Sequence, residues 1–308
     1  MSKYRIMSSK NRDSLSALGF LLPALIATIF VHIIPIAWGI IMSFQGLDIT
    51  TMSDMSTVPW VGFDNFAEIF TSDSEIGSRF GQSIINVIIY GAVTIPISLV
   101  ISLCVALLLN RPFKGRTFVR GLVLLPYITP DAVMYNVWRF IFQARIGVVN
   151  YLLMGVGFIA EPLVWLVGDR ALAAVIIASI WKGWSLACLM FLAGLQNIPE
   201  ELYEAAKIDG AGPVRSFFAI TLPQLWPIIS TMLVLSVIWN FHAFNQFYVL
   251  LGGDTGSSSA VPNLVIMREA FTNLHYGLGS AMSTLLLAVI MIVVGFLVLR
   301  KSKEGVEA

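Results

Sequence analysis

Six long apolar runs alternate with polar segments along the chain. Each run has about 20 or more residues, the length that a helix needs to cross a hydrocarbon core of about 30 Å. The runs cover residues 17–43, 83–109, 117–142, 171–195, 223–251 and 280–299. The pattern predicts an all-α polytopic membrane protein with six transmembrane helices.

Prolines interrupt several of these runs, and Pro126 and Pro130 in the third run have polar neighbours, Tyr135 and Asn136 among them. A proline removes a backbone hydrogen bond that lipid cannot replace. We therefore expect the carbonyl groups freed in this run to face protein or a wet cavity.

The polar segments predict the orientation and the domain limits. Placing residues 1–16, 110–120, 196–222 and the C-terminal end, Arg300 with the tail 301–308, on one side assigns thirteen Lys and Arg residues to that side and four to the opposite loops. By the positive-inside rule, both termini are predicted to be cytoplasmic. The transmembrane domain then covers residues 17–300. Its first run follows a basic stretch but is too long for a secretory signal, so we count it as a span.

Two segments on the opposite side have different characters. Residues 44–82 are acidic and rich in turn formers, and they predict a solvated loop that is long enough for a small ordered outer segment. Residues 147–158 are apolar but too short to cross, so we expect a helix that lies at the outer membrane face.

Composition excludes several classes of protein. The 308 residues are 57% hydrophobic and only 12% charged, which does not suit a soluble domain. The basic residues are scattered over loops, so a nucleic-acid partner is not indicated. Cys104 and Cys188 both fall inside apolar runs, where we expect small core residues rather than a disulfide or a metal pair.

The segment 196–222 is a polar insertion between two apolar runs. Pro199 followed by acidic residues predicts a helix start, and Gly210 and Gly212 with Pro213 predict its end. A second short helix with Phe217 and Phe218 would follow. The alternative is a loop that only rests on the cytoplasmic surface.

The same segment carries a recognisable motif. Glu204, Ala205 and Ala206 are followed after three residues by Gly210, and after nine more by Ile220, one residue, and Leu222-Pro223. This spacing resembles the EAA motif of permease subunits of bacterial ATP-driven (ABC) importers. The stretches "LPYITP", "IWKGW", "YVLLGG" and "REAFTNLHYGLGSAMSTLL" resemble the maltose-type (MalF-like) carbohydrate branch of that family.

The resemblance implies the type I ABC importer permease fold in the bacterial cytoplasmic (inner) membrane. It implies that segment 196–222 is a coupling-helix loop docked on an ATP-binding subunit. Two such subunits, a second and different permease chain, and an extracytoplasmic solute-binding protein are the implied partners. ATP and Mg would be bound by the partner ATPase, because this chain has no P-loop motif. The residues implied at the coupling surface are Glu204, Ala205, Ala206, Asp209, Gly210 and Ala211.

Polar and aromatic residues within the spans are candidates for a carbohydrate site, because rings stack on sugar faces while amides and hydroxyls pair with sugar hydroxyls. The candidates are Tyr135, Asn136, Trp181, Lys182, Trp184, Ser185, Asn240, His242, Asn245, Gln246 and Tyr248.

Other roles stay open for several candidates. Trp181 and Trp184 could be packing residues, Asn240 could hold helices together, and Lys182 or Arg139 could pair with Asp131. His242 has no second metal ligand at a suitable spacing.

Three other functions remain to be compared with the carbohydrate permease. An ion-coupled secondary transporter would need carboxylates at the membrane midplane, where only Asp131 is available. An intramembrane enzyme would need a catalytic motif, and none is found. A permease for a phosphorylated polyol would need several arginines in its cavity, but only Arg139 and Lys182 are available.

Overall fold

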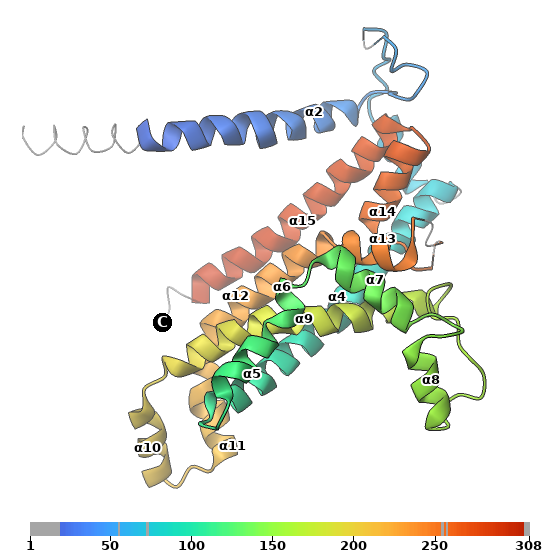
Figure 1. Cartoon of the computed structure of the whole chain (residues 1–308). Helices are drawn as coiled ribbons and strands as arrows, with labels where there is room; N and C mark the ends of the chain where they lie inside the picture. The colour runs from blue at the N-terminus through green and yellow to red at the C-terminus, as the bar shows by residue number, and fades with distance from the viewer. Residues whose placement is uncertain (1–18, 55, 72–73, 254–255, 257, 305–308) are drawn as a thin grey trace, which may run out of the picture. The chain divides into compact units, whose positions relative to one another are not determined.

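The computed structural model describes residues 19–54, 56–71, 74–253, 256 and 258–304, and it is mainly helical (Figure 1). Within these residues no strand forms, and a single antiparallel bridge joins Gln45 and Trp60. The chain forms two compact units, Met1–Phe70 with Ile266–Leu285, and Thr71–Val265 with Leu286–Ala308. The predicted cytoplasmic N-terminus, residues 1–16, lies outside the described residues, as does most of the predicted C-terminal tail.

Five of the described helical stretches are long and apolar enough to cross a membrane. They correspond to the first, second, fourth, fifth and sixth predicted spans. They cover Gly19–Met42, Glu75–Asn110, Arg170–Gln196, Pro213–Phe241 and Tyr276–Arg300. The first includes a π-turn, η1 (Ile29–Ile33), and α2 (Ile34–Met42). The last belongs to α15 (Tyr276–Glu304).

The third predicted span is not one helix. It forms α5 (Arg116–Val123), α6 (Leu125–Ile128) and α7 (Asp131–Ile141). Thr129 is extended, with φ −68° and ψ 127°, because a residue that precedes a proline disfavours the helical region. The run is thus interrupted at its prolines, and the count of six long helices is not confirmed in the described residues.

The loop predicted over residues 44–82 is largely ordered. It contains α3 (Asp64–Phe70) and the first two turns of α4 (Glu75–Asn110). The side chain of Ser74 accepts a hydrogen bond from the amide of Gly77 at 2.8 Å and caps α4. This cap starts the helix eight residues before the apolar run begins.

The fifth apolar run is broken as well. It folds as α12 (Leu222–Phe241) and α13 (Asn245–Leu251), with a bend at residues 242–244. Three further helices of the chain are α8 (Val148–Gly155), α9 (Arg170–Gln196) and α14 (Pro262–Met267). The short helix predicted over 147–158 is thus present as α8.

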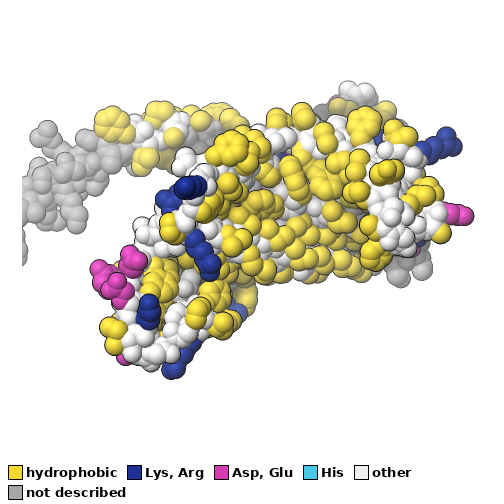
Figure 2. All heavy atoms as spheres, turned by 60° about the horizontal axis from the view of Figure 1, so that its bottom comes forward, with side chains coloured by type: hydrophobic (Ala, Val, Ile, Leu, Met, Phe, Trp, Pro, Cys, Tyr) yellow, Lys and Arg dark blue, Asp and Glu magenta, His cyan; other side chains and the backbone are white. Residues whose placement is uncertain are grey.

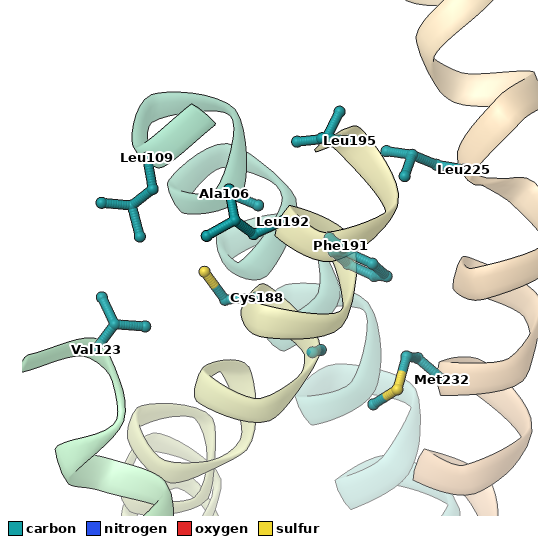
Figure 3. Close-up of a cluster of buried hydrophobic side chains, with 10 residues drawn as sticks. Ala106, Leu109, Val123, Cys188, Phe191, Leu192, Leu195, Leu225 and Met232 are labelled. Atoms are coloured by element: carbon teal, nitrogen blue, oxygen red, sulfur yellow. The ribbon is translucent and has the colours of Figure 1, made fainter. Parts of the chain in front are cut away.

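Helices α4, α9 and α12 pack side by side and form the core of the second unit (Figure 1). Figure 3 shows the buried apolar cluster, in which Cys188 and Phe191 of α9 lie between α4, α5 and α12. Cys188 is fully buried, as predicted, whereas Cys104 is exposed on the surface of the chain. The cluster fixes α9 as the central helix of this unit.

The first unit is organised around the turn that follows α2. The side-chain amide of Asn65 donates to the carbonyls of Ser43 and Gln45, at 2.9 and 3.0 Å. Asp48 accepts hydrogen bonds from the Thr50 side chain and from the Thr51 backbone, which lower its pKa to about 2. Gly277 donates its amide to the carbonyl of Leu47 at 2.8 Å. These contacts order a segment that the sequence predicted as solvated loop.

Candidate functional site

The polar segment between α9 and α12 begins with a short helix, α10 (Glu200–Ile208). Pro199 precedes it and Glu200 and Glu201 occupy its first turn, as the helix dipole favours. Gly210 has a φ of +76°. The amide of Gly210 donates to the carbonyl of Lys207 at 3.1 Å. The amide of Ala211 donates to the carbonyl of Ala206 at 2.8 Å. This pair of bonds is a Schellman motif, which needs a residue of positive φ at the position of Gly210.

Gly210 is required for its backbone conformation and not for close packing. A Cβ added there would meet no heavy atom within 4 Å. The turn was predicted correctly, but the surroundings of Gly210 are open.

The second short helix of the segment, α11, is not separated from α12. The π-turn η2 (Phe217–Thr221) joins α11 (Pro213–Ser216) directly to α12. Helical structure therefore runs from Pro213 to Phe241. The hydroxyl groups of Tyr203 and Thr221 lie 2.9 Å apart and tie α10 to this continuous helix.

The surface formed by α10, the Gly210 turn and α11 is exposed and of mixed character. Ile208 and Val214 are 86% and 72% exposed. Figure 2 shows acidic and basic side chains gathered over this end of the second unit, beside hydrophobic ones. Among the predicted coupling residues, Glu204, Ala205, Asp209 and Gly210 are exposed, and Ala206 and Ala211 are half-buried. We call residues 200–218 the α10–α11 knob.

A second group of predicted residues lies where α13 packs against α7 and α9. The amide of Gln246 donates to the hydroxyl of Tyr90 at 3.2 Å. Trp181 is 40% exposed and meets Trp138 edge to face. Tyr248 is 43% exposed and stacks on Phe244, with ring centroids 5.2 Å apart. The structure therefore places exposed rings on α9 and α13 close to the bend of the fifth run.

Other predicted residues are engaged by neighbouring helices. The hydroxyl of Ser185 is buried and donates to the carbonyl of Val123 on α5. The amide of Asn240 donates to the carbonyl of Val87 on α4 at 3.0 Å. Trp184 packs against the core cluster. These contacts give the three residues a structural role, which the sequence left open for Trp184 and Asn240.

The remaining polar candidates make local contacts or are buried. Asn136 donates to the carbonyl of Ala132 at 2.7 Å, and His242 lies 2.8 Å from the carbonyl of Ile238, each within its own helix or turn. Asn136, His242 and Asn245 are exposed, whereas Tyr135 is 4% exposed. His242 and Asn245 are thus exposed polar groups at the bend, and Asn136 is an exposed polar group on α7.

Lys182 contacts both residues that flank Pro130. Its ammonium group donates to the carbonyl of Thr129 at 2.9 Å and forms an ion pair with Asp131. The pair with Asp131 was one of the alternatives that the sequence left open for Lys182. Arg139, the other candidate for that pairing, is exposed on α7.

Two residues of this region were not predicted. Tyr90 and Trp138 each contact a predicted residue, Gln246 and Trp181 respectively. The only signal for Tyr90 in the sequence is a phenol within an apolar run. Among the described residues, no group of three His, Cys, Asp or Glu side chains could hold a metal ion.

Comparisons with known proteins identify the family. Residues 98–301 match the model described as binding-protein-dependent transport system inner membrane component. The chain is 35% identical to the sulfoquinovosyl glycerol transport system permease protein SmoG of Agrobacterium fabrum, over 91% of this chain and 88% of that protein. It is 32% identical to the trehalose/maltose transport system permease protein MalF of Thermococcus litoralis, over 92% of this chain and 94% of that protein.

A solved structure shows the same fold. A chain of a bacterial ABC transporter involved in the import of the acidic polysaccharide alginate matches with a TM-score of 0.80 and 24% identity, over 97% of this chain and 99% of that chain. The expected permease fold is confirmed, although the count of six long helices is not. The chain therefore belongs to the inner membrane component family of binding-protein-dependent transport systems, and it is a multi-pass permease subunit of the ABC type.

Proposed function

We propose that this chain forms half of the translocation pathway of an ATP-driven carbohydrate importer and couples to a separate ATP-binding subunit. The named relatives transport trehalose and maltose or sulfoquinovosyl glycerol, which supports a carbohydrate as the solute. The observation that carries the proposal is the exposed α10–α11 knob, joined without a break to a helix long enough to span the membrane. An ion-coupled transporter would leave this knob without a function.

The knob is the surface that we assign to the ATP-binding subunit. Its acids and its exposed Ile208 and Val214 offer both polar and apolar contacts to a partner. Exposed apolar side chains rimmed by charged ones are typical of surfaces that bind another protein. Because helical structure continues from Pro213 to Phe241, a displacement of the knob would move α12 with it.

The solute path is assigned to the exposed face near the bend between α12 and α13. Exposed amide and imidazole groups in an apolar helix are costly in lipid and therefore face water or protein. Trp181 and Tyr248 supply rings for stacking on a pyranose, and Asn136, His242 and Asn245 supply hydrogen-bonding groups. Gln246 supports Tyr90 at the same place.

The proposed assembly has the partners that the family resemblance implies. These are a second permease of different sequence, two ATP-binding subunits that hold ATP and Mg, and an extracytoplasmic solute-binding protein. The proposed location is the bacterial cytoplasmic membrane, with both termini and the knob on the cytoplasmic side.

The test is to reconstitute the complete complex in proteoliposomes with its solute-binding protein. Radiolabelled mono- and disaccharides are offered with and without internal ATP. Uptake that requires ATP and one of these sugars supports the proposal, and uptake that persists without ATP at a maintained ion gradient contradicts it.

A variant pair tests the knob separately. Ile208→Asp places a charge on α10, and Val156→Asp places the same charge at an exposed apolar position beside α8. We expect Ile208→Asp to lose the ATP-binding subunits on purification and Val156→Asp to retain them. Equal copurification of the two variants would remove the knob from the interface.

A further inference from the structure

The break between α6 and α7 leaves a backbone carbonyl that needs a partner. In a continuous helix the carbonyl of Thr129 would accept from the amide four residues later. Here Thr129 is extended, and α7 starts anew at Asp131. A bare carbonyl costs several kcal/mol in hydrocarbon, so a span can be broken only where another group supplies the missing hydrogen bond.

Lys182 supplies that hydrogen bond from another helix. Its ammonium group, on α9, lies 2.9 Å from the carbonyl of Thr129 and is paired with the carboxylate of Asp131. One side chain thus holds the last turn of α6 and the first turn of α7 at the same point of α9. A lysine ammonium has three donors, and two of them are used here.

The pair is not sealed inside the chain. The side chains of Lys182 and Asp131 are 21% and 41% exposed. Charged groups of a transmembrane region rarely face lipid, because each costs about 2.5–3.5 kcal/mol at the centre of a span. The exposed side of the pair therefore faces water or another subunit.

We propose that Lys182 and Asp131 form a positioning pair, which fixes the break of the third span against α9 at the wall of the aqueous path. This inference rests on the proposed transport function. Lys182 then acts through the backbone of the third span and does not bind the solute itself.

The experiment compares charge-neutral variants with a charge-retaining variant in the reconstituted complex. The neutral variants are Lys182→Gln and Asp131→Asn, and Lys182→Arg keeps the charge and the donors. The matched control is Arg79→Gln, which breaks the exposed ion pair between Arg79 and Glu75 on α4. For each variant we measure the maximal rate of ATP-dependent uptake and the solute concentration at half-maximal rate.

We expect each neutral variant to lower the maximal rate by about fivefold or more while the half-saturation concentration changes by less than about twofold. Lys182→Arg should keep at least about half of the wild-type rate, because a guanidinium retains both the charge and the donor groups, and Arg79→Gln should behave as the wild type. A higher half-saturation concentration for Lys182→Gln at an unchanged maximal rate would make Lys182 a solute ligand. A Lys182→Arg variant no better than Lys182→Gln would also overturn the proposal.

A second measurement does not depend on transport. In a chain carrying Cys104→Ser and Cys188→Ala, a single cysteine replaces either Asp131 or Val133, which point to opposite sides of α7. We expect a membrane-impermeant thiol reagent to label Asp131→Cys and to leave Val133→Cys unmodified. If Asp131→Cys is not labelled, the pair does not face water and the proposal is contradicted, whether or not any sugar is transported.

Discussion

Gly91 of α4 lies directly against the side chain of Asn240 of α12. A Cβ added to Gly91 would be 2.5 Å from the amide nitrogen of Asn240. The same nitrogen donates to the carbonyl of Val87, one turn earlier on α4. A small residue and a polar side chain together thus fasten these two helices, in the way that membrane helices commonly associate.

We expect Gly91→Ala to destabilise the permease. The added methyl group must displace Asn240 and break its hydrogen bond, and overpacking of this kind costs about 1–3 kcal/mol. The measurement is the thermal unfolding of the purified complex, in which Gly91→Ala should melt several degrees lower. Gly81→Ala on the same helix is the control, since its added Cβ would meet nothing within 4 Å. Equal melting temperatures would show that α12 does not press on Gly91.

We expect Gly210→Ala to weaken coupling to the ATP-binding subunit. A non-glycine residue in the left-handed conformation costs about 1–2 kcal/mol, which would unwind the end of α10. The measurement is the amount of ATP-binding subunit that copurifies, together with ATP-dependent uptake. Gly212→Ala is the matched control, because Gly212 has a φ of −72° and open space around it. The prediction fails if the two variants lose the same amount of partner.

We expect Tyr203→Phe to loosen α10 from α12. The change removes only the hydroxyl that bonds to Thr221, and such a bond contributes about 1 kcal/mol. Hydrogen exchange of the α10 amides should become faster by about fivefold, while the amides of α9 stay protected. Tyr151→Phe in α8 is the control, since Tyr151 is exposed and far along the chain. Unchanged exchange in α10 would show that this hydrogen bond does not hold the knob.

We expect Tyr248→Ala to raise the solute concentration at half-maximal uptake. Removing a ring that stacks on a sugar would lower affinity by about tenfold, with copurification of the ATP-binding subunit unchanged. Trp181→Ala should act in the same direction. Tyr151→Ala again serves as the control for loss of an exposed ring. Unchanged transport kinetics in both variants would move the solute site away from α9 and α13.

The sequence predicted the spanning helices from apolar length, and five runs correspond to long helices. It also marked the weak point of the third run, because Pro126 and Pro130 stand in it. The bend at residues 242–244 carries neither proline nor glycine. Nothing in the local pattern therefore separated α12 from α13.

For the site residues too, the local sequence pattern predicts the backbone conformation better than the contacts in space. Gly210 could be predicted because positive φ favours one residue type. The partners of Ser185 and Asn240 could not, because they depend on which helices become neighbours in space. A polar residue in an apolar run signals that it has some partner, and only the fold shows whether that partner is a helix or a solute.

Helix α4 contains 36 residues. At about 1.5 Å per residue it is about 54 Å long, well beyond a hydrocarbon thickness of about 30 Å. At the average tilt of about 20°, α4 still exceeds the roughly 40–45 Å of bilayer and headgroups together, and its polar first turns, with Glu75 and Arg79, lie outside the apolar run. The C-terminal end of α4 packs with Leu195 and Leu225 near the knob, so its polar N-terminal turns project into water at the opposite end of the second unit.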